Sequence, residues 1–181
     1  MKFYSTIKHI NLPRTAVESA WNFAKKVVST IDYSDSNQLQ LNKIRDDHFV
    51  SKLGEEACKI ILSEFAEVKG PDYNIYDASQ KSWSDDLYIN HMGFAVKTQR
   101  RTNAMKYSLS WTFQSGEKRK DIILNRPEAW VVFVEYDDTH PYTCYVYPPM
   151  QIKELIFDEP KLERLRGHKK VVYASTLKFV E

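Results

Sequence analysis

Asp72 and Lys97 are the two residues whose types and spacing most clearly suggest chemistry. Asp72 follows Pro71 in a turn, and Lys97 lies in the apolar run Phe94-Ala95-Val96-Lys97-Thr98-Gln99. An acid that closes one apolar turn and a lysine that ends a nearby strand can meet at one point. The acid could hold a divalent cation there, and the lysine could orient a water that attacks a phosphodiester. Ala95 leaves a gap, because a second carboxylate is expected two positions before the lysine.

A magnesium ion at that point would need few protein ligands. It prefers oxygen atoms and keeps several waters, so one or two carboxylates and a phosphate oxygen suffice, and the backbone carbonyl of Val96 could add one more. The pair also has an ordinary explanation, since Pro-Asp after glycine is a common turn and a lone lysine at a strand end is usually solvated. The context favours chemistry, because a predicted helix ends just before the acid and predicted strands carry both residues.

Three segments together resemble the core of the PD-(D/E)XK nuclease superfamily, and within it the type II restriction endonucleases. They are Leu53-Gly54-Glu55-Glu56-Ala57, residues 70–76 and residues 94–98. The resemblance implies a restriction-endonuclease-like fold, a Mg2+ cofactor and a helix glutamate that completes the metal site. Helix geometry favours Glu56, which lies beside the apolar stripe, whereas the Gly-Glu step favours Glu55. An ordinary solvated acidic pair explains each glutamate equally well.

Ala95 departs from the pattern of this superfamily, and three explanations fit it. Some relatives supply the acid from a following helix, where Glu117 or Asp121 would serve in this chain. A deliberate Glu-to-Ala change would instead block cleavage, so that uncut DNA can be held. The third explanation is that the protein has lost catalysis. The sequence slightly favours the second, because one restored residue gives an ordinary family strand, but it does not decide among the three.

A basic segment follows the candidate catalytic strand and predicts where DNA would lie. Between residues 97 and 120 there are seven Lys and Arg residues and one acid, Glu117, which gives +6 in a chain of +2. Basic groups attract phosphates, and Arg, Asn and Gln side chains can read base edges. Trp111 and Phe113 are expected to turn inward as core residues. The expected DNA contacts are Arg100, Arg101, Asn103, Lys106, Tyr107, Gln114, Lys118 and Arg119.

A second basic segment, residues 161–170, is tempered by Asp158, Glu159 and Glu163, and we expect it to be a surface face, with a phosphate contact as the alternative. Length and composition indicate one soluble domain over residues 1–181, with a hydrophobic fraction of 43%. Two distant cysteines and the lack of an apolar leader favour the cytoplasm, and no apolar run is long enough to span a membrane. The five histidines lack zinc-site spacing.

The order of the predicted helices and strands indicates an α/β (α+β) domain with a central mixed β-sheet flanked by helices, which would position the candidate residues. The catalytic core is expected over about residues 48–148. Apolar periodicity predicts helices over residues 15–31 and 48–68, separated by an irregular segment over 32–46. Lys69-Gly70-Pro71 is expected to end the second helix. Strands are predicted at 73–76, 87–89 paired with 92–98, 130–136, 142–147 and 171–180, with a turn at 77–79 and a short helix at 151–157.

The favoured hypothesis is a magnesium-dependent type II restriction endonuclease that cuts double-stranded DNA at a short specific sequence. Cutting both strands of a symmetric site would require a homodimer. The first helix could supply that interface, with Phe23 off its apolar stripe as a candidate contact. Two alternatives are another nuclease of the same superfamily, such as a junction resolvase or a repair endonuclease, and a non-catalytic DNA-binding protein.

Overall fold

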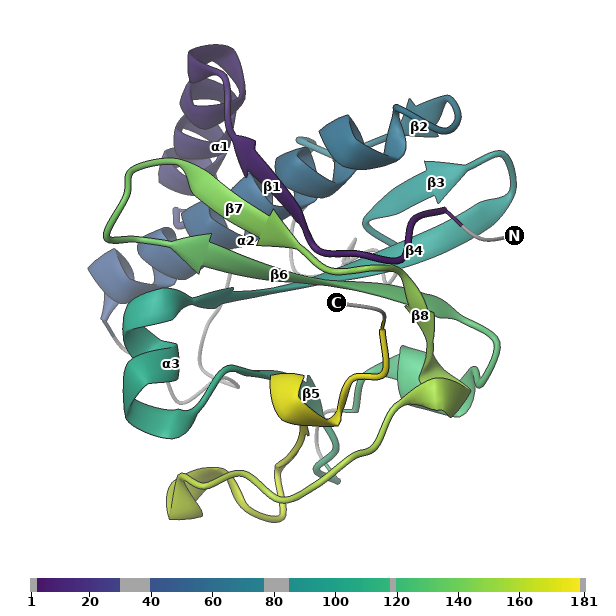
Figure 1. Ribbon diagram of the computed structural model, residues 1–181. Coiled ribbons are helices and arrows are strands. Elements are labelled where there is room, and N and C mark those ends of the chain that lie inside the picture. The colour runs from purple at the N-terminus through teal and green to yellow at the C-terminus, as the bar shows by residue number, and fades with distance from the viewer. Residues whose placement is uncertain (1–2, 30–39, 77–84, 118–119, 180–181) are drawn as a thin grey trace.

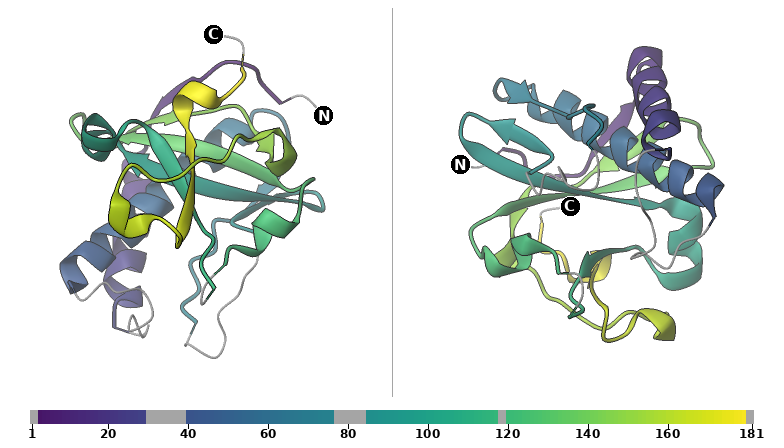
Figure 2. Two further views of the ribbon diagram at one scale, coloured as in Figure 1. Left: turned by 90° about the horizontal axis from the view of Figure 1, so that it is seen from below. Right: turned by 180° about the vertical axis from the view of Figure 1, so that it is seen from behind.

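A mixed β-sheet forms the centre of the protein. The structure, a computed structural model, describes residues 3–29, 40–76, 85–117 and 120–179. Within them the main sheet has the strand order β1-β7-β6-β4-β3-β2, and β8 pairs with β6 beside this path. Helices α1 (Arg14–Val27) and α2 (Leu41–Leu62) cover one face of the sheet (Figure 1). A small second sheet of β5 (Ser110–Gln114) and β9 (Lys169–Tyr173) lies over the other face, as the views in Figure 2 also show.

Strand pairing sets the direction of each element in the main sheet. β2, β3 and β4 form an antiparallel meander, β4 runs parallel to β6, and β7 pairs antiparallel with both β6 and β1. A parallel pair requires a long crossover. Here the crossover contains α3 (Arg101–Tyr107), β5 and the 3-10 turn Ile122–Asn125. The strands are β1 (Lys8–Asn11), β2 (Val68–Lys69), β3 (Leu87–Ile89), β4 (Met92–Arg100), β6 (Trp130–Asp137), β7 (Thr143–Val146) and β8 (Met150–Gln151).

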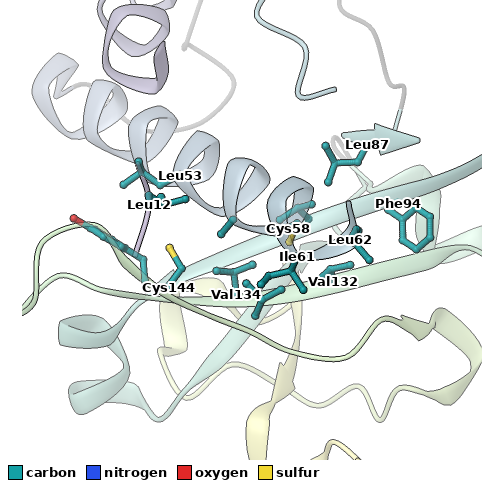
Figure 3. Packing of buried hydrophobic residues seen from close by; sticks show 14 of the residues in the cluster. Leu12, Leu53, Cys58, Ile61, Leu62, Leu87, Phe94, Val132, Val134 and Cys144 are labelled. Carbon is teal, nitrogen blue, oxygen red and sulfur yellow. The ribbon is translucent and has the colours of Figure 1, made fainter. Parts of the chain in front are cut away.

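Two apolar cores lie on the two faces of this sheet. The larger one packs Leu53 and Leu62 of α2 against sheet residues such as Phe94 and Val132 (Figure 3). The smaller one joins the β5–β9 sheet to the main sheet. In that core the indole N–H of Trp111 donates a 2.9 Å hydrogen bond to the backbone oxygen of Val134, deep in the main sheet.

The side chains of β4 alternate between the two faces of the sheet, and this alternation determines on which face Lys97 lies. Phe94 and Val96 face α2, whereas Ala95 packs with the smaller core. Successive strand residues point to opposite faces, so Lys97 shares the side of Ala95. Its Nζ accordingly lies 4.8 Å from the centre of the Phe113 ring on β5. Lys97 therefore lies between the two sheets, with about a quarter of its side chain exposed.

Most predicted elements are confirmed, and the differences have local causes. Both helices and the strands at 87–89, 92–98, 130–136 and 142–147 are present, but the first helix ends at Val27, and the last two residues of its expected range lie outside the described residues. The second helix begins at Leu41, inside the segment expected to be irregular, because buried Ile44 extends its apolar stripe. It ends at Leu62, before the expected 68, and Val68 instead pairs with Ile89 of β3.

Three further predictions differ from the structure. Residues 73–76 have no regular secondary structure, although a strand was expected there. The predicted helix at 151–157 is only the 3-10 turn Ile152–Glu154. The predicted last strand begins at Lys169 and ends at Tyr173, where the 3-10 turn Ala174–Thr176 follows. The expected turn at 77–79 lies outside the described residues.

The inward orientation of Trp111 and Phe113 is confirmed, since their exposed fractions are 2% and 0%. Over the described ranges, no helix combines the length and the apolar character that crossing a membrane requires.

Candidate functional site

Asp72 lies in the exposed loop that follows β2, and this loop binds its carboxylate. Oδ1 accepts the backbone N–H of Asn74 at 2.8 Å, and Oδ2 accepts the hydroxyl of Tyr76 at 2.6 Å. The slight burial of the carboxylate opposes ionisation, but the hydrogen bonds from Tyr76 and Asn74 outweigh it and lower the pKa of Asp72. These contacts are those of a residue that stabilises its own turn. They also explain why the chain here does not form the expected strand.

Lys97 instead forms an ion pair with Asp121. Its Nζ donates a 2.8 Å hydrogen bond to Oδ2 of Asp121, an oxygen that also accepts the backbone N–H of Gln114 at 3.2 Å. The side chains of Lys97 and Asp121 are 26% and 18% exposed, so solvent screens the pair only in part. Asp121 is one of the two later acids that the sequence offered as a substitute for the residue missing at Ala95.

Asp86 is an acid next to β4 that the sequence did not single out. It directly precedes β3, and the pairing of Leu87 with Phe94 places it across the ladder from Ala95. Its Oδ2 accepts the backbone N–H of Val96 at 2.7 Å, and its own N–H donates to the oxygen of Phe94 at 3.0 Å. The Asp86 carboxylate is therefore held against the backbone of the segment that carries Lys97.

Burial raises the pKa of Asp86, and the N–H of Val96 and the charges of Lys97 and Lys52 offset part of that effect. One feature of the sequence indicates that Asp86 lies near Lys97. It directly precedes the first strand of a hairpin, and the second strand of that hairpin carries Lys97.

Glu55 is the helix glutamate that points into the protein. It is only 3% exposed, its Oε2 lies 2.5 Å from Nζ of Lys52, and its Oε1 accepts the hydroxyl of Ser51 at 3.3 Å. Burial, followed by the negative charge of Asp86, raises the pKa of Glu55 to about 8, even though Lys52 acts against both. The negative charges of Glu55 and Asp86 therefore disfavour each other's ionisation.

Gly54 explains how α2 brings Glu55 so near to β4. A Cβ atom at Gly54 would lie 1.9 Å from Oγ1 of Thr98, so only glycine allows this close approach. Glu56, the other helix candidate, is half-buried, and its carboxylate accepts the hydroxyl of Tyr73 at 2.7 Å. The two glutamates that sequence could not separate thus have different surroundings, Glu55 beside Lys52 and Asp86 and Glu56 beside the 70–76 loop.

Lys52 has two aromatic neighbours in addition to Glu55. Its Nζ lies 4.9 Å from the ring centre of Phe23 and 5.5 Å from that of Tyr73. Phe23 also forms edge contacts with Tyr73 and His48 and is half-buried. The residue expected to contact a second copy therefore packs within its own chain.

The expected DNA contacts divide into two groups. Arg100 donates to the backbone oxygen of Asp46 at 3.0 Å, and Arg101 forms ion pairs with Glu135 and Asp137, so both hold parts of the fold together. The others differ in exposure: Asn103, Lys106 and Tyr107 are exposed on α3, Gln114 is half-buried in β5, and Lys118 and Arg119 lie outside the described residues.

Asp86 and Glu55 are two carboxyl groups near β4 whose pKa values are raised. In the part of the chain that the structure describes, no group of three or more His, Cys, Asp or Glu side chains could hold a metal ion. Mg2+ retains several waters and needs only one or two carboxylates, so Asp86 and Glu55 are the acids here that could hold it. Each has a raised pKa, and a nearby positive charge would favour its ionised form.

No protein family model matches this chain, and no curated protein or solved structure is significantly similar to it. Function must therefore be inferred from the residues themselves.

Proposed function

We propose that the protein is a magnesium-dependent endonuclease that hydrolyses double-stranded DNA. One observation carries the proposal: the Asp86 carboxylate, which accepts the N–H of Val96, interacts electrostatically with Glu55 of α2 and with Lys97 on the other face of β4. The 2.7 Å hydrogen bond from Val96 to Asp86 supports it, and so do the effects of the Asp86 charge on the pKa of Glu55 and of the Lys97 charge on the pKa of Asp86. In this proposal Asp86 takes the role that the sequence suggested for Asp72.

Each residue has a distinct role in the proposed reaction. Asp86 and Glu55 would hold Mg2+, which supplies Lewis-acid chemistry and lowers the pKa of water when bound. Glu55 must lose its proton to act as a ligand, so metal binding would release that proton. Lys97 would orient the attacking water and place a positive charge beside the phosphate, where negative charge builds up.

Asp121 supports the first of the three explanations of Ala95. Position 95 has no side-chain oxygen, whereas Asp121 brings a carboxylate within 2.8 Å of Lys97 from the crossover. We infer that Asp121 replaces the missing acid by holding Lys97 in position. The narrower proposal, a type II restriction enzyme that acts as a homodimer on a short symmetric sequence, rests on the resemblance of the three segments.

Plasmid cleavage with Mg2+ tests this proposal, with EDTA as the blank. Asp86→Asn and Lys97→Ala are expected to lower the rate at least a hundredfold, because each removes a group that acts on the reacting phosphate. Asp72→Asn is the matched control, since it makes the same chemical change in the exposed loop and should cut like the parent. If neither the parent nor Ala95→Glu cuts any DNA, the nuclease proposal is wrong.

A specific observation also favours a second candidate, a non-catalytic DNA-binding protein. Asp121 already neutralises the charge of Lys97, and Ala95 offers no ligand, as expected for a site that has lost its chemistry. Such a protein would bind duplex DNA equally well with and without Mg2+. A nuclease with a Mg2+ site would bind its target more tightly with the ion.

A further inference from the structure

The β5–β9 sheet places two basic segments of the chain side by side. β9 runs antiparallel to β5, so that Phe113 pairs with Lys170 and Gln114 with Lys169. Beyond the strands, the backbone N–H groups of Ser115 and Gly116 both donate to the oxygen of His168, at 2.9 and 3.0 Å. The start of β9 is thus joined to the segment that leads to Asp121, although more than forty residues separate them in sequence.

Lys170 emerges close to the candidate site. Directly paired residues of an antiparallel ladder project on the same face. Lys170 therefore shares the face of Phe113, the ring beside which the Lys97 ammonium lies at 4.8 Å. Phe113 is fully buried whereas Lys170 is exposed, so the lysine projects at the rim of the space between the two sheets.

Lys120 reaches the same rim from the crossover. It pairs with Ser115 as an isolated β-bridge, and the next residue, Asp121, donates its N–H to the oxygen of Gln114 at 2.9 Å. Lys120 is exposed and directly precedes the acid that holds Lys97. Lys120 and Lys170 therefore flank the Lys97–Asp121 pair from two segments of the chain.

The two lysines at this rim have no direct ion-pair partner among the described carboxylates. Neither Lys120 nor Lys170 forms an ion pair with a described carboxylate, and Asp121 already pairs with Lys97. Exposed His168 and half-buried Lys169 lie beside them. Asp158, which forms a bridge with Val171, accepts the N–H of Glu159 with its Oδ1 and is a negative charge next to this rim. A ligand with several negative charges at fixed spacing would suit such a rim, and the phosphates of duplex DNA provide them.

We propose that Lys120 and Lys170 form a phosphate clamp that holds the DNA backbone beside Lys97. The clamp rests on the proposed function for its choice of DNA as the polyanion, and it assigns a role to the 161–170 segment, for which the sequence favoured a surface face over a phosphate contact. Both lysines contact phosphates and no bases, so they position DNA without adding sequence preference.

The salt dependence of duplex binding tests the clamp. We would measure the affinity of the full chain for a labelled 20-base-pair duplex in EDTA by fluorescence anisotropy, over a range of salt concentrations. Each phosphate contact contributes about 0.9 to the slope of log affinity against log salt. Lys120→Ala with Lys170→Ala should reduce that slope by about 1.8 and weaken binding roughly fiftyfold near 0.1 M salt.

The matched control is Lys25→Ala with Lys26→Ala, which removes two exposed lysines from α1 on the opposite face of the main sheet. The control should keep the parent slope, and Lys170→Arg should keep it as well because the charge remains. Thermal melting of each variant identifies any loss of folding, and Lys170→Glu gives a second test of the same site.

The outcomes separate the clamp from the nuclease proposal. If the clamp variant and the α1 control lose the same amount of duplex affinity and of salt slope, the clamp is wrong and the nuclease proposal stays intact. DNA binding with the expected slopes but no cleavage by the parent or by Ala95→Glu would overturn the nuclease proposal and support the clamp. Absence of duplex binding by the parent would overturn both.

Discussion

The backbone N–H of Val96 donates a 2.7 Å hydrogen bond to the carboxylate of Asp86. This contact fixes an acid across from Ala95, directly before the strand that pairs with the one carrying Lys97. A side-chain carboxylate introduced at position 95 would therefore lie beside Asp86. Both the chemistry and the stability of the protein should respond to such a change.

Ala95→Asp is expected to create a stronger cation site at a cost in stability. Without a cation, two adjacent carboxylates repel each other, and we expect the melting temperature in EDTA to fall by several degrees. Saturating Mg2+ should restore most of that loss, because an ion bound only by the folded state stabilises it. Calorimetric melting with and without Mg2+ measures both effects. Ala95→Asn is the control for size, and an equal response of the two variants to Mg2+ would contradict the prediction.

Glu55 should make the stability of the protein depend on pH between about 4.5 and about 8. The folded state holds the proton of Glu55 up to a pKa of about 8, compared with 4.5 for the ordinary side chain, so the folded form binds more protons than the unfolded chain. The resulting stabilisation is complete below the lower pKa and is lost as pH rises through the upper one, a change on the order of a few kcal/mol.

Urea unfolding from pH 5 to pH 8 measures this effect in the parent and in Glu55→Gln. The variant lacks the titrating group, so its free energy of unfolding should decline less with rising pH. Glu56→Gln, one position along α2, should follow the parent. Parallel curves for the parent and Glu55→Gln would show that Glu55 does not keep its proton in the folded state.

The Lys97–Asp121 ion pair should contribute modestly to stability and strongly to function. The pair is partly exposed, so Asp121→Asn is expected to cost about 1 kcal/mol in the free energy of unfolding. A double-mutant cycle with Lys97→Met isolates the coupling between the two side chains. Releasing the charge of Lys97 should also tighten nonspecific duplex binding, whereas cleavage should fall if Asp121 positions Lys97. Unchanged cleavage in Asp121→Asn would show that Asp121 does not replace the missing acid.

Gly54 should not tolerate even alanine, although alanine favours helix formation elsewhere. The new Cβ would lie 1.9 Å from Oγ1 of Thr98, so α2 or β4 must shift. We expect a loss of about 2 kcal/mol or more in unfolding free energy, along with a displaced Glu55. Gly54→Ala combined with Thr98→Ala should recover part of the loss. Gly116→Ala is the control, because its Cβ would make only ordinary contacts at 3.4 Å and beyond.

Sequence predicted the strands best where alternation was regular and the partner strand was nearby. The hairpin of β3 and β4 and the buried strand β6 follow directly from their apolar patterns. The N-terminal turns of α2 were missed because Leu41 and Ile44 are isolated among polar residues. A two-residue strand such as β2 leaves almost no periodicity to detect.

The choice between Asp72 and Asp86 could not be made from local pattern. Each acid is followed by a short run of alternating residues, and the difference arises from the pairing of Leu87 with Phe94. The contact between Lys97 and Asp121 depends in the same way on how the crossover folds back over the sheet. Register and crossover geometry are properties of the whole chain, so sequence could name Asp121 only as one of two options.

The hydrogen bond from Trp111 to Val134 has a consequence for recognition. It joins the layer that bears Lys170 to the sheet that bears Asp86, and a buried indole leaves little freedom for one layer to slide over the other. The separation between Asp86 and Lys170 is therefore fixed in the free protein. In the proposed complex the protein would act as a rigid body, and any bending needed for the fit would occur in the DNA.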